Sequence, residues 1–171
     1  MLVPDVLPCL SFHQPWVEMM LDPRIGKDIE NRPWNTHYRG PFLFHAARIL
    51  DLASSRAAFQ FLRHMRERDQ VSITAAEIFN MERDVAKLSF GGIVGGGWLT
   101  DVIEPEKHSG AHPWHMREFN RRPQYGLRLE SRLRLPFRPY RGSQRWFNVK
   151  LTDEEKTLIE AWTSRLLGGK A

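Results

Sequence analysis

Gly26-Lys27-Asp28-Ile29-Glu30-Asn31-Arg32-Pro33-Trp34 is a segment near the start of this sequence that combines basic, acidic and aromatic side chains. In an extended strand successive side chains point to opposite faces, so Asp28, Glu30 and Arg32 would share one face. Ile29 would then enter the core. Lys27 joins Glu30 only if it still belongs to the preceding turn, which a glycine before it permits. These residues allow two interpretations: a solvated strand edge with a weak ion pair, or a charged functional site.

Regular structure is predicted on both sides of this segment. Residues 7–12 form a short apolar strand, and the proline at the start of residues 15–21 favours a helix. Residues 42–46 are a compact apolar run, typical of a buried strand. His45 within that run is more often a core histidine than a catalyst or ligand. Arg48 follows the strand, where a phosphate contact and a surface ion pair both fit.

Two further regions have helical character. Residues 51–90 carry apolar side chains at helical spacing, and the sequence from Thr74 to Glu77 is a capping box. We expect two helices there, packed as a lid or side layer. A last helix is predicted over residues 153–167, capped by Thr152.

From Gly91 onward the pattern becomes β. Residues 91–103 mix branched and aromatic side chains with glycines, which favours the tight curvature of a small barrel. The segment lacks the fingerprint of a dinucleotide-binding site. Residues 125–138 alternate leucine with arginine, so leucines should face inward and arginines outward. Arg128 and Arg145 belong to this basic surface, which fits a nucleic-acid track and an ordinary exterior equally well.

Residues 105–123 are irregular and polar, with a short helix expected over residues 113–120. This region contains three histidines and a glutamate that could suggest a metal site. They lack the spacing of a helical zinc motif, so neither a metal nor another cofactor is predicted. These four residues are His108, His112, His115 and Glu118.

The composition of the chain further limits its class of protein, its partners and its location. The chain of 171 residues is 42% hydrophobic and 26% charged, as expected for one globular domain. Its formal charge of +5, carried mostly by arginine, favours an anionic partner. Cys9 is the only cysteine, which excludes an internal disulfide. We see neither a signal peptide nor a membrane-spanning segment, so a cytoplasmic protein without a membrane partner is expected, its oligomeric state left open.

Several segments, taken in order, resemble the ASCH-domain family of the PUA-like superfamily. The match extends over roughly residues 8–150 and is carried by five short pieces. The matching pieces are Leu10-Ser11-Phe12-His13-Gln14-Pro15-Trp16 (family pattern S-x-R-Q-P-W), Lys27-Asp28-Ile29-Glu30-Asn31-Arg32 (K-x-x-E-x-R), Tyr38-Arg39-Gly40-Pro41 leading to His45-Ala46, Gly92-Ile93-Val94-Gly95 with Tyr125-Gly126, and Gly142 with Phe147-Asn148-Val149.

The resemblance implies an α+β fold: a PUA-like small mixed β-barrel flanked by helices, with residues 1–171 as one domain and residues 51–90 as a helical insertion. It also implies binding of RNA, another single-stranded nucleic acid or a modified nucleobase in a basic cleft. The alternative is a metal-independent hydrolase in the same cleft, either a ribonuclease or an N4-acetylcytidine amidohydrolase. His13 departs from the family arginine, and Glu30 stands where the amidohydrolases have a threonine nucleophile.

Eleven residues are therefore candidates for the site. Lys27 and Glu30 would be catalytic if the protein is an enzyme, with Glu30 as a base and Lys27 or Arg32 stabilising charge. An amide-hydrolysing variant would instead need Ser11 as its nucleophile. The candidates for ligand binding are Ser11, Gln14, Trp16, Lys27, Glu30, Arg32, Trp34, Tyr38, Arg48, Arg128 and Arg145.

Overall fold

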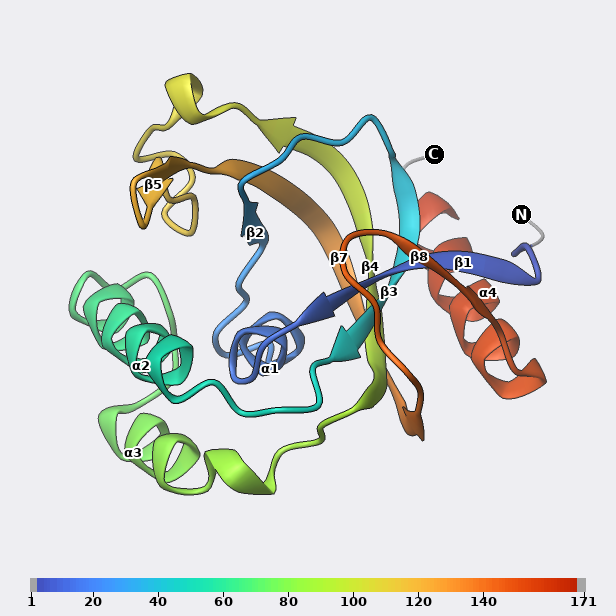
Figure 1. Ribbon diagram of the computed structural model, residues 1–171, viewed down its shortest axis with the longest axis horizontal. Coiled ribbons are helices and arrows are strands. Elements are labelled where there is room, and N and C mark those ends of the chain that lie inside the picture. The colour runs from blue at the N-terminus through green and yellow to red at the C-terminus, as the bar shows by residue number, and fades with distance from the viewer. Residues whose placement is uncertain (1–2, 169–171) are drawn as a thin grey trace.

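The computed structural model describes residues 3–168 and shows an α+β protein (Figure 1). One six-stranded sheet has the strand order β2-β7-β4-β3-β1-β8, and a two-stranded hairpin is formed by β5 and β6. The strands are β1 (Val6–Phe12), β2 (Ile29–Arg32), β3 (Gly40–Ala46), β4 (Gly92–Ile103), β5 (Glu118–Phe119), β6 (Arg122–Pro123), β7 (Tyr125–Pro139) and β8 (Phe147–Lys150). The helices are α1 (Trp16–Leu21), α2 (Leu52–Glu67), α3 (Ala75–Arg83) and α4 (Asp153–Gly168), with 3₁₀ turns η1 (Val85–Lys87) and η2 (Pro105–Lys107).

The sheet is mixed, because β1 runs parallel to β3 while the other neighbouring strands are antiparallel. The long strands β4 and β7 form its centre and curve strongly (Figure 1). Among the described residues, β2 and β8 are the two edges and no pairing joins them. The predicted α+β class is confirmed, whereas closure of the sheet into a barrel is not observed.

Helices cover both faces of the sheet. Helix α4 lies on one side, and α1, α2 and α3 lie on the other (Figure 1). Side chains alternate along each strand, so β1 sends Cys9 into the core that contains Trp162 of α4. The neighbouring Phe12 enters the opposite core with Val17 of α1. A third cluster joins α2 and α3 to Ile29 of β2.

Most predicted elements are confirmed. The helices of residues 51–90 are α2 and α3. The capping box is present: Thr74 Oγ1 accepts from the backbone N–H of Glu77, and the Glu77 side chain accepts from the backbone N–H of Thr74. The glycines of β4 allow the expected close approach. A Cβ on Gly97 would lie 2.6 Å from the Phe44 ring, so only glycine fits at this crossing.

The short helix predicted over residues 113–120 is wrong. This segment contains turns and leads into the β5–β6 hairpin. The side chain of Asn31 donates to Trp114 O and accepts from Met116 N, which uses backbone groups that a helix would need. Asn120 and Arg121 both have positive φ angles, which form the hairpin turn and exclude helical conformation there.

None of the helices within residues 3–168 has the length and apolar character needed to span a lipid bilayer.

Candidate functional site

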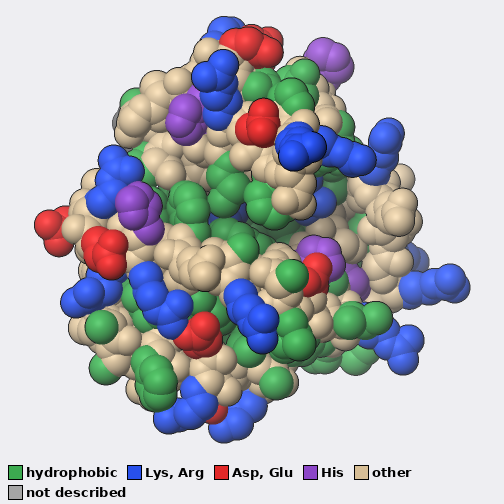
Figure 2. Space-filling view, turned by 60° about the vertical axis from the view of Figure 1, so that its left-hand side comes forward, with side chains coloured by type: hydrophobic (Ala, Val, Ile, Leu, Met, Phe, Trp, Pro, Cys, Tyr) green, Lys and Arg blue, Asp and Glu red, His purple; other side chains and the backbone are tan. Residues whose placement is uncertain are grey.

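A cleft of about 670 Å³ opens beside the segment Gly26–Trp34. Its floor comes from β2 and the end of β1, one wall from α1 and α2, and the opposite wall from residues 116–124. Figure 2 looks at this side of the molecule, where Lys and Arg side chains surround a hollow with hydrophobic side chains in it. The cleft is lined by Ser11, Phe12, His13, Trp16, Lys27, Glu30, Asn31, Arg32, Pro33, Ala47, Ser54, Ala57, Met116, Phe119, Asn120, Arg122 and Gln124.

Lys27 is buried at the floor of the cleft, with only 1% of its surface exposed. Gly26 has a φ of +62°, so Lys27 leaves a turn before β2 begins and its side chain reaches Glu30. The Lys27 ammonium lies 3.0 Å from Glu30 Oε2 and also donates to Ile29 O. Burial lowers the pKa of Lys27, and the carboxylate of Glu30 opposes that shift.

Arg32 completes a row of charges with Glu30 at its centre. Arg32 Nε lies 3.0 Å from Glu30 Oε1, and Arg32 Nη2 donates to Ser11 O over 2.7 Å. The guanidinium carbon lies 5.1 Å from the centre of the Phe12 ring and 5.9 Å from that of Trp34. These contacts hold the guanidinium plane in one orientation beside the cleft.

The Arg32 side chain retains hydrogen-bonding capacity. Its Nε is buried and has no partner of proper hydrogen-bond geometry, although Glu30 is close. No described residue accepts from Arg32 Nη1 either, since Nη2 alone donates within residues 3–168. Lys27, Glu30 and Arg32 therefore form a cluster, here called the charged floor, with net charge +1 when all three groups are ionised.

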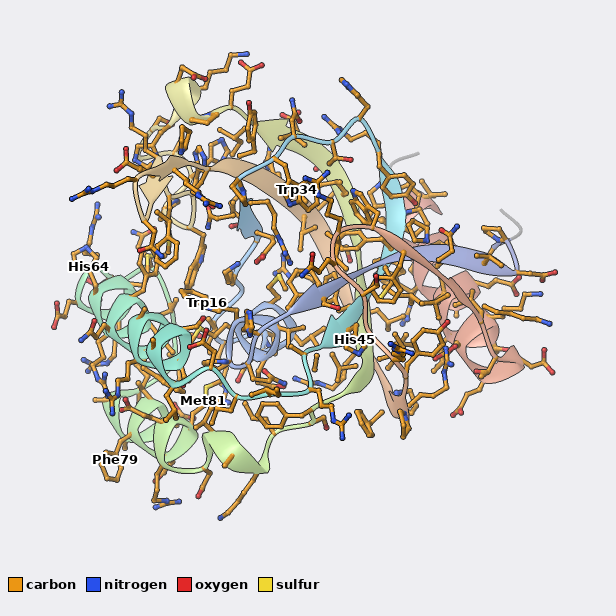
Figure 3. All side chains as sticks on the ribbon, in the orientation of Figure 1. Trp16, Trp34, His45, His64, Phe79 and Met81 are labelled. Atoms are coloured by element: carbon orange, nitrogen blue, oxygen red, sulfur yellow. The ribbon has the colours of Figure 1, made fainter. Side chains whose placement is uncertain are left out.

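Trp16 forms an aromatic surface above the charged floor. Its Nε1 donates to Ser54 Oγ of α2 over 3.0 Å, and the ring centre lies 5.5 Å from Lys27 Nζ. Figure 3 shows Trp16 beside α1 and α2, whereas Trp34 lies toward the connection between β2 and β3. The hydrogen bond fixes the indole plane, so Trp16 can offer a preformed stacking surface.

The opposite wall contains residues that sequence patterns did not single out. Met116 and Phe119 line the cleft, and Asn31 anchors the segment that carries them. The pair Asn120-Arg121 between two potential strand residues is a turn signal that would have indicated a hairpin there. The wall itself could not be placed from sequence, because it approaches β2 from more than eighty residues along the chain.

Five of the eleven predicted site residues lie together at the cleft: Ser11, Trp16, Lys27, Glu30 and Arg32. Ser11 takes part through its backbone, since its carbonyl holds Arg32. Its hydroxyl lies 3.0 Å from His45 Nδ1 and 3.1 Å from Ser143 O, on the side of β1 that Cys9 also faces. His45 Nε2 in turn donates to Tyr140 O, and burial lowers the pKa of His45, so the neutral ring accepts from Ser11. The expectation of a core histidine at position 45 is confirmed.

Three other predicted residues lie outside the lining of the cleft. Gln14 is buried and donates to Ser89 O, while its Oε1 has no partner among the described residues. Trp34 packs against Trp146, with ring centres 6.3 Å apart. Tyr38 also packs against Trp146, and its hydroxyl donates to Pro41 O over 2.5 Å.

Three predicted arginines lie apart from the cleft lining. Arg48 is exposed beside Gly91, and Arg145 is exposed in the connection before β8. Arg128 lines a second cavity of about 450 Å³, which also includes Asp28 and Arg132. Asp28 was expected on the same face as Glu30, but it lines this second cavity. It precedes β2, which starts at Ile29, so the alternation of side chains along the strand does not include it.

Within residues 3–168, no group of three or more His, Cys, Asp or Glu side chains is arranged to hold a metal ion. The chain matches none of the protein-family models, and no curated protein matches it at a significant level. Function is therefore inferred from the geometry and chemistry of the cleft.

Proposed function

We propose that the cleft binds one unstacked nucleobase, presented by RNA or another single-stranded nucleic acid or as a modified nucleoside. The observation that carries this proposal is the charged floor of Lys27, Glu30 and Arg32 at the base of a cleft with Trp16 in its wall. Ligand sites are commonly mostly apolar clefts with a few fixed polar groups, and a volume of about 670 Å³ is in their range.

A planar base matches the chemistry of each surface of the cleft. Trp16 offers an aromatic face, and unstacked bases are commonly held on such rings. Glu30 can accept from an exocyclic amino group, while the free N–H groups of Arg32 can donate to a ring nitrogen or carbonyl. The charged floor thus offers acceptor and donor groups side by side to one edge of the base.

The resemblance to ASCH-domain proteins supports the same proposal, since the K-x-x-E-x-R residues are the three that form the charged floor. We extend the proposal to the fold family: the curved mixed sheet with helices on both faces is a PUA-like domain in which, among the described residues, β2 and β8 do not pair with each other.

Titration calorimetry with the four common ribonucleosides and their N-methylated and N-acetylated forms tests the proposal. We expect at least one to bind to the wild-type protein, and Trp16→Leu to weaken that binding about 5-fold to 100-fold, as expected for a lost stacking contact. Trp98→Leu is the matched control, because Trp98 packs against Trp162 on the α4 side. Equal binding by both variants, or no binding by the wild type, would refute a base in this cleft.

Hydrolysis in the same cleft is a second candidate, favoured by one observation. Burial lowers the pKa of Lys27, which makes its neutral, proton-accepting form more accessible than in an exposed lysine. The Ser11 hydroxyl bonds to His45 away from the charged floor, so Lys27 and Glu30 are the better catalytic candidates. Incubation of labelled RNA and N4-acetylcytidine with wild type and Lys27→Met in EDTA would reveal turnover. Equal product from both proteins would indicate a contaminating enzyme.

A further inference from the structure

The β5–β6 hairpin, Glu118–Pro123, forms the outer part of the wall opposite α2. Its base is held on both sides. Asn31 bonds to the backbone on either side of His115, and His115 Nε2 donates to Gln124 O over 2.9 Å. Trp114 also packs on Phe61 of α2, with ring centres 5.4 Å apart. The hairpin is thus fixed relative to the charged floor.

The turn of this hairpin carries an arginine where glycine is favoured. Asn120 has φ +50° and Arg121 has φ +59°, the pattern of a two-residue turn with both central residues left-handed. Asparagine accepts this conformation readily, but arginine does so at an energetic cost. A costly residue at the tip of a hairpin that lines a cleft suggests that its side chain has a use.

The hairpin also presents unneutralised charge. Arg117, Arg121 and Arg122 are exposed, and none of them makes an ion pair with a described carboxylate. Two arginines of β7 differ, since Arg134 pairs with Glu18 and Arg138 with Glu155. Phe119 stands among the hairpin arginines with 48% of its surface exposed and lines the cleft.

The geometry points to the hairpin as the backbone-binding edge of the site: Arg121 and Arg122 hold phosphates of a single-stranded nucleic acid, and Phe119 stacks on one of its bases. This inference rests on the proposed function and specifies that the base arrives within a phosphodiester chain. Free guanidinium groups around an exposed ring, next to a cleft for a base, are the combination that single strands require. An acidic peptide would use the arginines but would leave the aromatic surfaces without a partner.

The test compares two double variants of equal net charge. Arg121→Gln/Arg122→Gln removes hairpin charge, and Lys150→Gln/Arg165→Gln removes charge from exposed positions on β8 and α4. The probes are a labelled mixed-sequence RNA 10-mer and the DNA 10-mer of the same sequence, measured by fluorescence anisotropy from 50 to 300 mM salt. The two probes distinguish ribose from deoxyribose strands.

Of the two double variants, we expect only Arg121→Gln/Arg122→Gln to lower the affinity for the labelled strands. The slope of log affinity against log salt should become shallower by about 1.4, because each single-strand phosphate contact contributes roughly 0.7. Phe119→Ala should weaken the binding about 5-fold to 100-fold. Phe137→Ala, at an equally exposed ring with 45% of its surface accessible, should leave the affinity unchanged.

Equal losses from the two double variants would overturn the inference, since the hairpin would then contribute only general charge. If Trp16→Leu weakens binding of the RNA 10-mer and the hairpin variants do not, the hairpin is excluded while the base-binding cleft stands. If the hairpin variants weaken binding and Trp16→Leu does not, the strand bypasses the cleft and the proposed function fails. Circular dichroism of each variant would verify its folding.

Discussion

Two buried ion-pair networks lie on opposite sides of the sheet and differ in how completely they are bonded. Beneath α4, Glu155 accepts from Arg138 Nε over 2.7 Å and from Arg138 Nη2 over 2.9 Å. Glu155 also accepts from the backbone of Thr152, and Arg138 Nη2 reaches Lys150 O. Both carboxylate oxygens are used, so this network joins α4 to β7 and has little capacity for another partner.

The charged floor is equally buried around Lys27, but it is incomplete. Arg32 Nε has no partner of proper geometry, and the cluster faces a cleft of about 670 Å³. Removing charges from water is costly unless their hydrogen bonds are satisfied, and a ligand could supply the missing partners. A structural ion pair therefore differs from one suited to binding a ligand in whether all of its hydrogen-bonding groups have partners, and not in burial alone.

The largest expected effect follows from removing the carboxylate of the charged floor. Glu30→Gln leaves Lys27 buried either as an unpaired ammonium or as an amine forced to release its proton. We expect a loss of about 3 to 5 kcal/mol in the free energy of unfolding at pH 7, measured with urea. Glu155→Gln should cost less, about 1.5 to 3 kcal/mol, because the Arg138 side chain is 26% exposed and can turn to water.

The double variant Lys27→Met/Glu30→Gln isolates the cause. Since it removes both members of the pair, it should recover most of the stability lost in Glu30→Gln. A Glu30→Gln protein within 1 kcal/mol of wild type would show that the floor charges are solvated, and the contrast between the two networks would disappear.

A smaller loss of stability is expected from a substitution in the densely packed α4 side of the sheet. A Cβ on Gly142 would lie 2.4 Å from His45 Cε1 and 2.8 Å from Ser11 Oγ, so Gly142→Ala must displace a bonded pair. We expect a loss of about 1 to 3 kcal/mol in thermal or urea unfolding. Gly110→Ala is the control, since no atom lies within 4 Å of its added Cβ. Equal stability of both variants would show that the polar contact of Ser11 and His45 has room to move.

Local patterns in the sequence identified much of this architecture. The capping box at Thr74, the alternation along β7 and the turn before Lys27 each depend on neighbours in the chain, and each is present in the structure. The grouping of Lys27, Glu30 and Arg32 was also predictable, because three residues on one short segment need little tertiary information.

The rest depends on contacts between distant segments. Whether Arg128 faces the cleft or the second cavity is decided by how β7 pairs with β2, which no local pattern specifies. The partners of Ser11 were hidden for the same reason, since His45 and Ser143 come from two other parts of the chain. The wall opposite α2 was missed because Asn31 looks like an ordinary exposed polar residue until Trp114 is placed beside it.

The pH dependence of stability should differ between the two sides of the sheet. Burial lowers the pKa of Lys27, whereas the unfolded chain keeps that proton up to about pH 10.5. Between the lowered pKa and 10.5 the unfolded state binds more protons, so the contribution of Lys27 to stability rises with pH. The difference in unfolding free energy between wild type and Lys27→Met should therefore increase with pH between the lowered pKa and 10.5, by at most about 1.4 kcal/mol per pH unit.

Lys156→Met supplies the control from α4. Its hydrogen bond to Asp5 raises the pKa of Lys156, so the lysine stays charged in both folded and unfolded states below pH 9. The difference in unfolding free energy between wild type and Lys156→Met should stay flat up to pH 9, because neither state releases the proton. Taking differences also cancels the effect of Cys9, whose thiol pKa burial raises. A flat or falling difference for Lys27→Met would mean that the cleft leaves Lys27 hydrated, and the charged floor would then resemble an ordinary surface ion pair.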